Sequence, residues 1–114
     1  PPFGFSANPD TWLPMPAEWA ALTVEKQRAD TASTLAFFRT VIGLRRERSE
    51  FDGDGIEWLS APREALVFRR RGGSLVCALN AGGEPIALPP GEVILASAAL
   101  VDGKLPPDVA AWLA

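Results

Sequence analysis

The sequence predicts an α+β fold, in which one long helix is followed by an antiparallel β-sheet or a small β-sandwich. Two observations lead to this prediction. Residues 31–48 carry apolar side chains at helical spacing, whereas from residue 56 onward the pattern changes to short β-like runs. Turn signals separate those runs about every ten residues, which is typical of antiparallel strands. The chain has 114 residues, the length of a single domain.

Residues 1–22 are expected to form an ordered loop that lies on another surface. Their prolines interrupt regular hydrogen-bonding ladders, yet their apolar side chains are too many for a free linker. The chain has no initiator methionine and no signal peptide, so we expect it to begin partway through a longer protein. The prolines are Pro1, Pro2, Pro9, Pro14 and Pro16, and the apolar residues are Phe3, Phe5, Trp12, Leu13, Met15 and Trp19.

Two helices are expected next. Thr23 is placed to cap a helical turn that extends to Ala29, and Asp30 or Ser33 is placed to cap a helix over 31–48. The apolar residues of the second helix cover two adjacent faces, so we expect burial from two sides. One cover is the following sheet, and the other is absent from these residues. Leu35, Phe38 and Ile42 form one face, and Phe37, Val41 and Leu44 form the next.

The strand pattern contains one strong hairpin signal, Gly72-Gly73. In the register that it sets, Phe68 faces Cys77 and Leu66 faces Leu79, which places large apolar groups on one face. Strands are expected at 56–59, 66–71, 74–80, 85–88, 92–97 and 109–113, with further turns at 52–55, 80–83, 89–91 and 102–104.

Composition excludes several functions. The chain has no His and no Tyr, so Ser-His-Asp and Cys-His catalysis are excluded and a zinc site is nearly so. No phosphate-binding loop is present, and we expect no cofactor. Residues 52–55 resemble the start of a calcium loop, but Ile56 and Arg63 stand where oxygen ligands are needed, so no metal is expected. Nearly all of the 14 acidic residues are expected at turns, helix ends or exposed strand positions, without an apolar pocket that would raise the pKa of a general acid.

The net charge and the hydropathy pattern indicate which partners and which location to expect. A net charge of -3 argues against nucleic acid, and the arginines at 45–48 and 69–71 are expected at a helix end and a hairpin tip. No run reaches the ~18 apolar residues of a membrane span. Cys77 is the single cysteine and lies in an apolar run, so we expect an inert buried thiol and a cytoplasmic protein. The four tryptophans fit core or interface packing better than a sugar-stacking platform.

Two sets of motifs occur in a fixed order along the chain. The earlier motifs are residues 2–5, 12–16 and 22–25, Gln27, Asp30, residues 33–35 and residues 38–45; the later ones are Trp58-Leu59, residues 66–71, residues 76–82, residues 105–108 and Trp112-Leu113. Together they resemble the α-glucosidase branch of the α-amylase family of glycoside hydrolases. The earlier motifs resemble the end of its catalytic barrel, with the loop after the eighth strand and then the eighth helix, and the later ones resemble its C-terminal β-domain.

This resemblance implies that residues 1–50 are the last loop and helix of a TIM-type barrel and that residues 51–114 are the C-terminal antiparallel β-domain. The family cleaves α-glucosidic bonds with retention, using an Asp nucleophile, a Glu acid/base and a supporting Asp on the barrel. Their motifs lie upstream of the matched part, so no catalytic residue is carried over. Phe3, Phe5 and Trp12 are candidates for a place near the sugar site of the parent enzyme.

The sequence therefore favours an inactive C-terminal segment that supports the catalytic barrel, its partner, with the α-glucoside bound only in the parent. The alternative is an independent carbohydrate-binding or protein-interaction β-module, which exposed tryptophans on one face would favour. A self-sufficient enzyme is disfavoured because the carboxylate motifs are missing. In isolation, the apolar surfaces predict self-association through Phe37, Val41 and Leu44.

Overall fold

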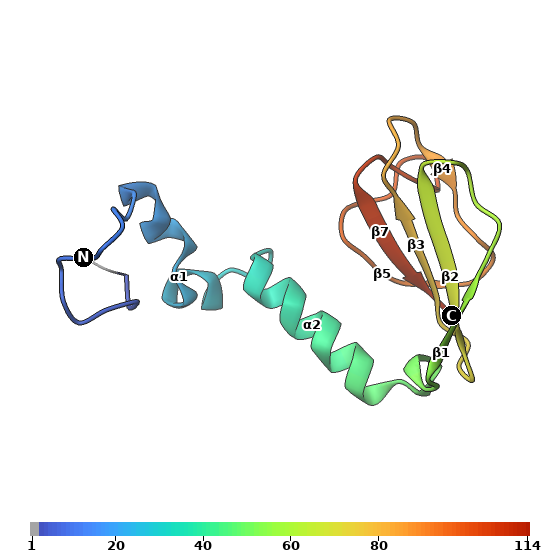
Figure 1. Cartoon of the computed structure of the whole chain (residues 1–114), viewed down its shortest axis with the longest axis horizontal. Helices are drawn as coiled ribbons and strands as arrows, with labels where there is room; N and C mark the ends of the chain where they lie inside the picture. The colour runs from blue at the N-terminus through green and yellow to red at the C-terminus, as the bar shows by residue number, and fades with distance from the viewer. Residues whose placement is uncertain (1–2) are drawn as a thin grey trace. The chain divides into compact units, whose positions relative to one another are not determined.

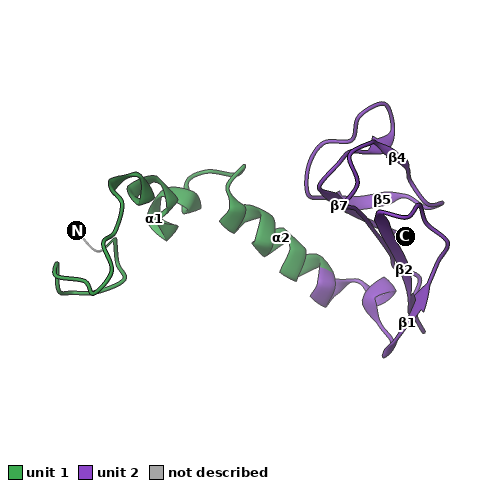
Figure 2. Ribbon diagram, turned by 45° about the horizontal axis from the view of Figure 1, so that its top comes forward, with its two compact units in different colours: residues 1–44 green, residues 45–114 purple. Residues whose placement is uncertain are grey.

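A computed structural model describes residues 3–114, so Pro1 and Pro2 of the predicted loop lie outside the described residues. The chain divides into two compact units, one ending at Leu44 and the other running from Arg45 to Ala114 (Figure 2). Helical elements make up the first unit, and strands dominate the second (Figure 1).

The loop predicted over residues 1–22 is only partly correct, because a 3-10 helix, η1, occupies Ala17–Leu22. It starts directly after Pro16, the last proline of this region, where the backbone is again free to form helical hydrogen bonds. Helix α1 follows at Val24–Arg28. The Thr23 hydroxyl accepts a hydrogen bond from the Lys26 N–H at 3.3 Å, which confirms the predicted cap.

Helix α2 covers Thr34–Glu47 and is shorter than the predicted 31–48. Of the two predicted caps, Ser33 is correct, because its hydroxyl accepts a hydrogen bond from the Ala36 N–H at 3.2 Å. Asp30 instead accepts a bond from the Ala32 N–H at 2.8 Å, which closes a turn before the helix begins. No residue of α2 is buried.

The second unit contains a five-stranded antiparallel sheet, with the strand order β1-β2-β3-β7-β5, and a two-stranded sheet of β4 and β6. This confirms the predicted antiparallel β-domain. A short 3-10 helix, η2 at Ser49–Phe51, precedes the sheet. The strands are β1 Gly55–Trp58, β2 Ala65–Arg71, β3 Val76–Asn80, β4 Ile86–Ala87, β5 Val93–Ala96, β6 Lys104–Leu105 and β7 Val109–Leu113.

The chain leaves the large sheet twice, and this explains what the strand predictions missed. It departs after β3 to form β4 and after β5 to form β6, so that β7 enters between β3 and β5. Strand β6 was not predicted because it has two residues and the first of them, Lys104, falls within the predicted turn at 102–104. In that turn, Asp102 and Gly103 have φ angles of 50° and 70°, the left-handed conformation of a tight hairpin.

One face of the large sheet forms the core, together with Leu105 of β6, whose exposed fraction is 0%. The Asn80 side chain fixes this layer, since its amide donates to the Leu105 carbonyl at 3.0 Å and to the Glu84 carbonyl at 2.9 Å. Such satisfied polar groups can be buried at low cost. The core residues are Val67, Val76, Ala78, Leu105, Val109, Ala111 and Leu113.

The predicted hairpin register is confirmed, because Leu66 pairs with Leu79 and Phe68 pairs with Cys77. The large apolar groups of this register, however, lie on the face opposite the core, where the Leu66 side chain is 52% exposed. Alternate side chains of a strand point to opposite faces, so the smaller residues between them fill the core. We call this second surface the outer face; it comprises Ile56, Trp58, Leu66, Phe68, Arg70, Cys77, Leu79 and Trp112.

Candidate functional site

The hairpin tip between β2 and β3 holds the segment that precedes the sheet. The Leu75 N–H donates to the Glu50 carbonyl at 3.0 Å. Gly73 allows this approach, because a Cβ there would lie 2.7 Å from the Asp52 carbonyl oxygen. The attachment brings Phe51 onto the outer face, where its ring meets Trp112 edge to face at 4.8 Å between centroids.

A hollow of about 200 Å³ opens on the outer face beside this aromatic pair. Cys77 contributes to its wall, and burial raises the pKa of this thiol, an effect that a hydrogen bond with Trp112 partly opposes. A raised pKa lowers the thiolate fraction at neutral pH, which agrees with an unreactive thiol. The lining residues are Arg45, Phe51, Ile56, Phe68, Arg70, Leu75, Cys77 and Trp112.

The arginines of β2 all have partners inside the second unit. Arg69 lies 3.7 Å from the Glu57 carboxylate, Arg70 donates to the Gly53 carbonyl, and Arg71 donates to the Ile56 carbonyl at 3.3 Å. These contacts stabilise the hairpin and its flanking turn. They support the structural interpretation of this basic cluster over phosphate binding.

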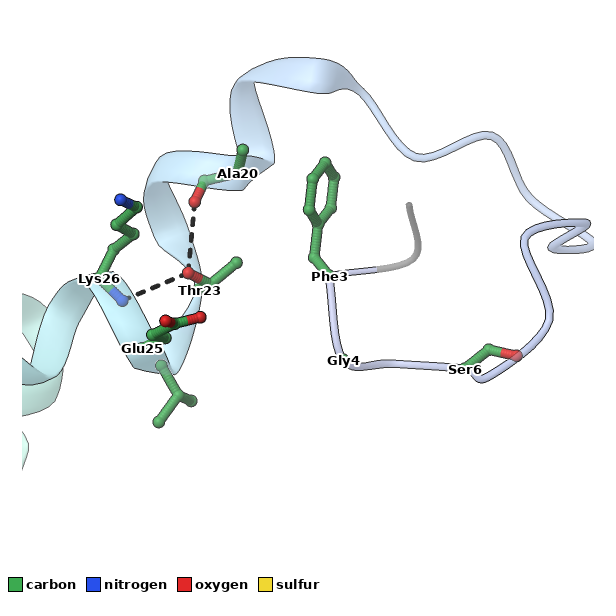
Figure 3. A pocket seen from close by; sticks show the side chains of 8 residues that line it. Phe3, Gly4, Ser6, Ala20, Thr23, Glu25 and Lys26 are labelled. Atoms are coloured by element: carbon green, nitrogen blue, oxygen red, sulfur yellow. Dashed lines mark hydrogen bonds between the residues drawn. The ribbon is translucent and has the colours of Figure 1, made fainter.

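The candidate sugar-proximal residues lie in the first unit, and the structure brings two of the three together. Phe3 lines an open pocket of about 600 Å³, where it lies across from Thr23 and Glu25 (Figure 3). Phe3 and Phe5 also share a second hollow of about 380 Å³. Trp12 lines neither and is 97% exposed.

Gln27 joins the helical elements of the first unit, a role that was not predicted from the sequence. Its side-chain amide donates to the Leu22 carbonyl at 2.6 Å, while its side-chain oxygen accepts from the Leu35 N–H at 2.9 Å. Its backbone carbonyl accepts from the Ser33 hydroxyl at 2.8 Å. One residue thus links η1, α1 and the start of α2 by polar contacts alone.

None of the three hollows named above is lined by a pair of carboxylates, which glycoside cleavage uses. The larger pocket contains one acid, Glu25, among its lining residues. The pKa of Glu50 is lowered, first by a backbone hydrogen bond and then by Arg48, opposite to the shift that a general acid needs. Within residues 3–114, no group of three potential metal ligands occurs, and no helix has the length and apolarity to cross a bilayer.

These features define a small β-domain with a preceding helical segment. A family described as "Domain of unknown function (DUF3459)" matches residues 52–112, and the chain belongs to this family. DUF3459 is the C-terminal domain of α-amylase-family enzymes.

A curated relative supports the same assignment. The protein named salivary alpha-glucosidase from Aedes aegypti is 34% identical over 88 residues, which cover 75% of this chain and 15% of the relative. The chain therefore spans a small part of that protein's length. The similarity covers more residues than the stretch 52–112 contains, so it extends into the segment before Asp52. Together, these findings confirm the predicted resemblance to a C-terminal part of an α-glucosidase-like protein.

The hollow on the outer face was not predicted from the sequence. Its two arginines, Arg45 and Arg70, were expected at a helix end and at a hairpin tip, not at one common site. A signal was present, because Leu66, Phe68, Cys77 and Leu79 alternate with smaller residues along the hairpin. Alternation shows that two faces differ, but large side chains on one face do not show which face the rest of the chain will cover.

Proposed function

We propose that this chain is the C-terminal, non-catalytic segment of a retaining glycoside hydrolase that acts on α-glucosidic bonds. Residues 1–50 complete the catalytic barrel, and residues 51–114 form the domain that supports it. The observation that carries this proposal is the similarity to salivary alpha-glucosidase, because it extends beyond the β-domain into the preceding segment.

The uncovered apolar surface of the first 50 residues supports the same proposal. Phe38 and Ile42 of α2 are 55% and 47% exposed, and Trp12 in the preceding loop is almost fully exposed. Leaving several large apolar groups in water is unfavourable, at about 25 cal/mol for each Å² that could be buried. A barrel that contacts this loop and helix would cover them, and the β-domain would then stabilise the barrel from its C-terminal side.

In this account, the α-glucoside binds to the complete enzyme and not to this chain. Phe3 and Phe5 are the residues that the proposal places near the sugar. A cytoplasmic location belongs to the proposal as well and is supported by the free, half-buried thiol of Cys77.

The test is hydrolysis of p-nitrophenyl α-glucoside by the purified 114-residue chain, with its intact mass measured on the same sample. We expect no hydrolysis above the buffer control. Activity that co-elutes with the intact chain over two separations would show that it builds its own acid pair, and the proposal would be wrong.

A second candidate, a carbohydrate-binding module, is favoured by one observation. Trp58 lies on the outer face and is 64% exposed, as a sugar-stacking residue would be. Its ring, however, stacks edge to face on Phe68 with 5.7 Å between centroids, and Ile56 flanks it on the same strand face. A sugar needs polar partners beside its aromatic platform, and these neighbours offer none.

Titration calorimetry with maltotriose distinguishes the two candidates. We expect no heat of binding from the wild-type chain. Binding that is lost in Trp58→Ala and retained in Trp19→Ala would establish the carbohydrate-binding module instead.

A further inference from the structure

The hollow on the outer face combines an apolar wall with two cationic groups. Six of its lining residues are apolar, aromatic or thiol side chains, and the remaining two are Arg45 and Arg70. No carboxylate lines the hollow. Across residues 3–114, the ion pairs join Arg48 to Glu50 and Arg69 to Glu57, so no described acid neutralises Arg45 or Arg70.

This arrangement is complementary to an apolar group that carries a negative charge. Two guanidinium groups of like charge at one apolar site repel each other, and a carboxylate between them would relieve that repulsion while accepting charge-assisted hydrogen bonds. The hollow is somewhat larger than the engineered cavity of about 150 Å³ that binds benzene, so it can receive one large side chain.

The surroundings favour a protein as the source of that group. From the hollow, the apolar surface continues over Ile56, Trp58 and Leu66, which are 44%, 64% and 52% exposed. Contiguous apolar surface of this kind marks protein contacts, and Trp and Arg are enriched at their energetic centres. A free small ligand would leave this extension uncovered.

We propose that the outer face is a docking surface for a protein segment that presents a large apolar side chain beside a carboxylate. The apolar side chain enters the hollow against Phe51 and Trp112, and the carboxylate lies between Arg45 and Arg70. Arg45 lies in the last turn of α2, and the other residues that line the hollow come after residue 50. The test measures docking at the hollow and does not use the activity of the parent enzyme.

A second copy of the chain fits this surface poorly. In a two-fold dimer, each outer face would meet its own equivalent, which would bring Arg70 of one copy towards the arginines of the other. The face presents no acid to compensate them, and like charges across an interface are unfavourable.

Cys77 makes the hollow accessible to measurement, because it is the single thiol and forms part of the wall. The test follows the rate at which the neutral reagent 4,4′-dithiodipyridine modifies Cys77 in the full chain. Three peptides are added in turn: acetyl-Glu-Trp-Leu-amide and its versions with Gln or Lys in place of Glu. They share the apolar groups. Gln removes the charge of Glu with nearly the same shape, and Lys reverses its sign.

We expect the Glu peptide to protect Cys77 at a concentration about five-fold lower than the Gln peptide, as for a partly exposed ion pair, and the Lys peptide to protect least. Arg45→Gln and Arg70→Gln should each reduce this preference, and the double variant should abolish it. Arg46→Gln is the matched control, since it removes an exposed charge from the same helix turn without changing the hollow's lining, and it should keep the preference.

Arg70→Gln also removes a hydrogen bond to the Gly53 carbonyl, so it can weaken the fold as well as docking. Among the described contacts, the Arg45 side chain makes no such bond. Arg45→Gln therefore tests docking without a loss of folding contacts. Equal protection by all three peptides, or no protection at the highest soluble concentration, would overturn the proposal. Protection that increases with protein concentration in the absence of peptide would identify a second copy as the occupant and would overturn it as well.

Discussion

The two units of the chain are held together by different forces. Every described residue that is both apolar and buried lies in the second unit, between Ala65 and Leu113. In the first unit, the one buried residue among those described is Ser33, a polar helix cap. The β-domain thus has its own hydrophobic core, whereas the segment before Arg45 is organised by caps and by the hydrogen bonds of Gln27.

The difference shows which unit has a hydrophobic core of its own. Hydrogen bonds contribute about 1 kcal/mol each, too little to offset the entropy of ordering some forty residues. A segment of this kind needs apolar cover from elsewhere, and α2 carries the apolar side chains that such cover would bury. The β-domain needs no such cover for its core, because its own strands bury the apolar side chains.

Truncating a buried side chain of the core should change the free energy of unfolding more than any other substitution proposed below. Leu105→Ala deletes a fully buried side chain where β6 packs on the large sheet, and we expect the free energy of unfolding to fall by about 2–5 kcal/mol. Urea denaturation followed by far-UV circular dichroism measures this. Val101→Ala, at a position 51% exposed, is the control and should change it by about 0.5 kcal/mol or less. Equal losses in both variants would show that β6 does not cover the core.

The strands of the β-domain were easier to predict from the sequence than the question of which face of the sheet is buried. The Gly72-Gly73 turn fixes the hairpin, so the pairing of Phe68 with Cys77 followed from local chemistry. The position of β7 between β3 and β5 depends on two excursions of the chain, and no local signal encodes them. The outer face was missed for the same reason, since burial is decided by what packs on a face.

The helical segment was predictable at its caps, where one side chain binds a nearby N–H group. Thr23 and Ser33 fulfil this role as predicted. The place of Phe3 and Phe5 at a sugar site stays a prediction, because it concerns atoms outside this chain.

A substitution at Gln27 should lower the stability of the helical segment without lowering that of the β-domain. Gln27→Ala removes two side-chain hydrogen bonds, and we expect the helices of residues 24–47 to lose about 1–2 kcal/mol of local stability. The β-domain, which those bonds do not reach, should keep its unfolding midpoint. Amide hydrogen exchange measured residue by residue reports both.

Gln27→Glu is the matched variant, because it keeps the acceptor for the Leu35 N–H and loses the donor to the Leu22 carbonyl. It should retain the start of α2 and loosen η1. A drop in the melting temperature of the β-domain in either variant would contradict the independence of the two units.

The apolar face of α2 should affect solubility more than folding. Phe37→Asp or Val41→Asp introduces a charge on a helix that contains no buried residue, so we expect less self-association and an unchanged unfolding free energy within about 0.5 kcal/mol. Sedimentation velocity on the variants and on Thr40→Asp, an exposed control on the same helix, measures association. A large loss of folding would instead place Phe37 and Val41 in a core of this chain.

The smallest effect is expected from Glu50. Its folded-state pKa is lowered by a backbone hydrogen bond and by Arg48, so the carboxylate adds stability above its unfolded pKa and loses it as the pH falls through the folded value. Glu50→Gln should therefore lower the melting temperature slightly at neutral pH and reduce its fall below about pH 4.5. If the melting temperatures of Glu50→Gln and the wild type fall equally as the pH is lowered, Glu50 does not contribute to the pH dependence of stability.

The β-domain has a hydrophobic core of its own, and we propose that the first fifty residues are stabilised by the catalytic barrel. Native-state hydrogen exchange of the whole chain tests this claim most directly. We predict that the amides of β2, β3 and β7 exchange only through global unfolding, while those of α1 and α2 exchange many times faster through local opening. Equal protection of α2 and the central strands would contradict the claim, because the helical segment would then possess a stabilising core of its own.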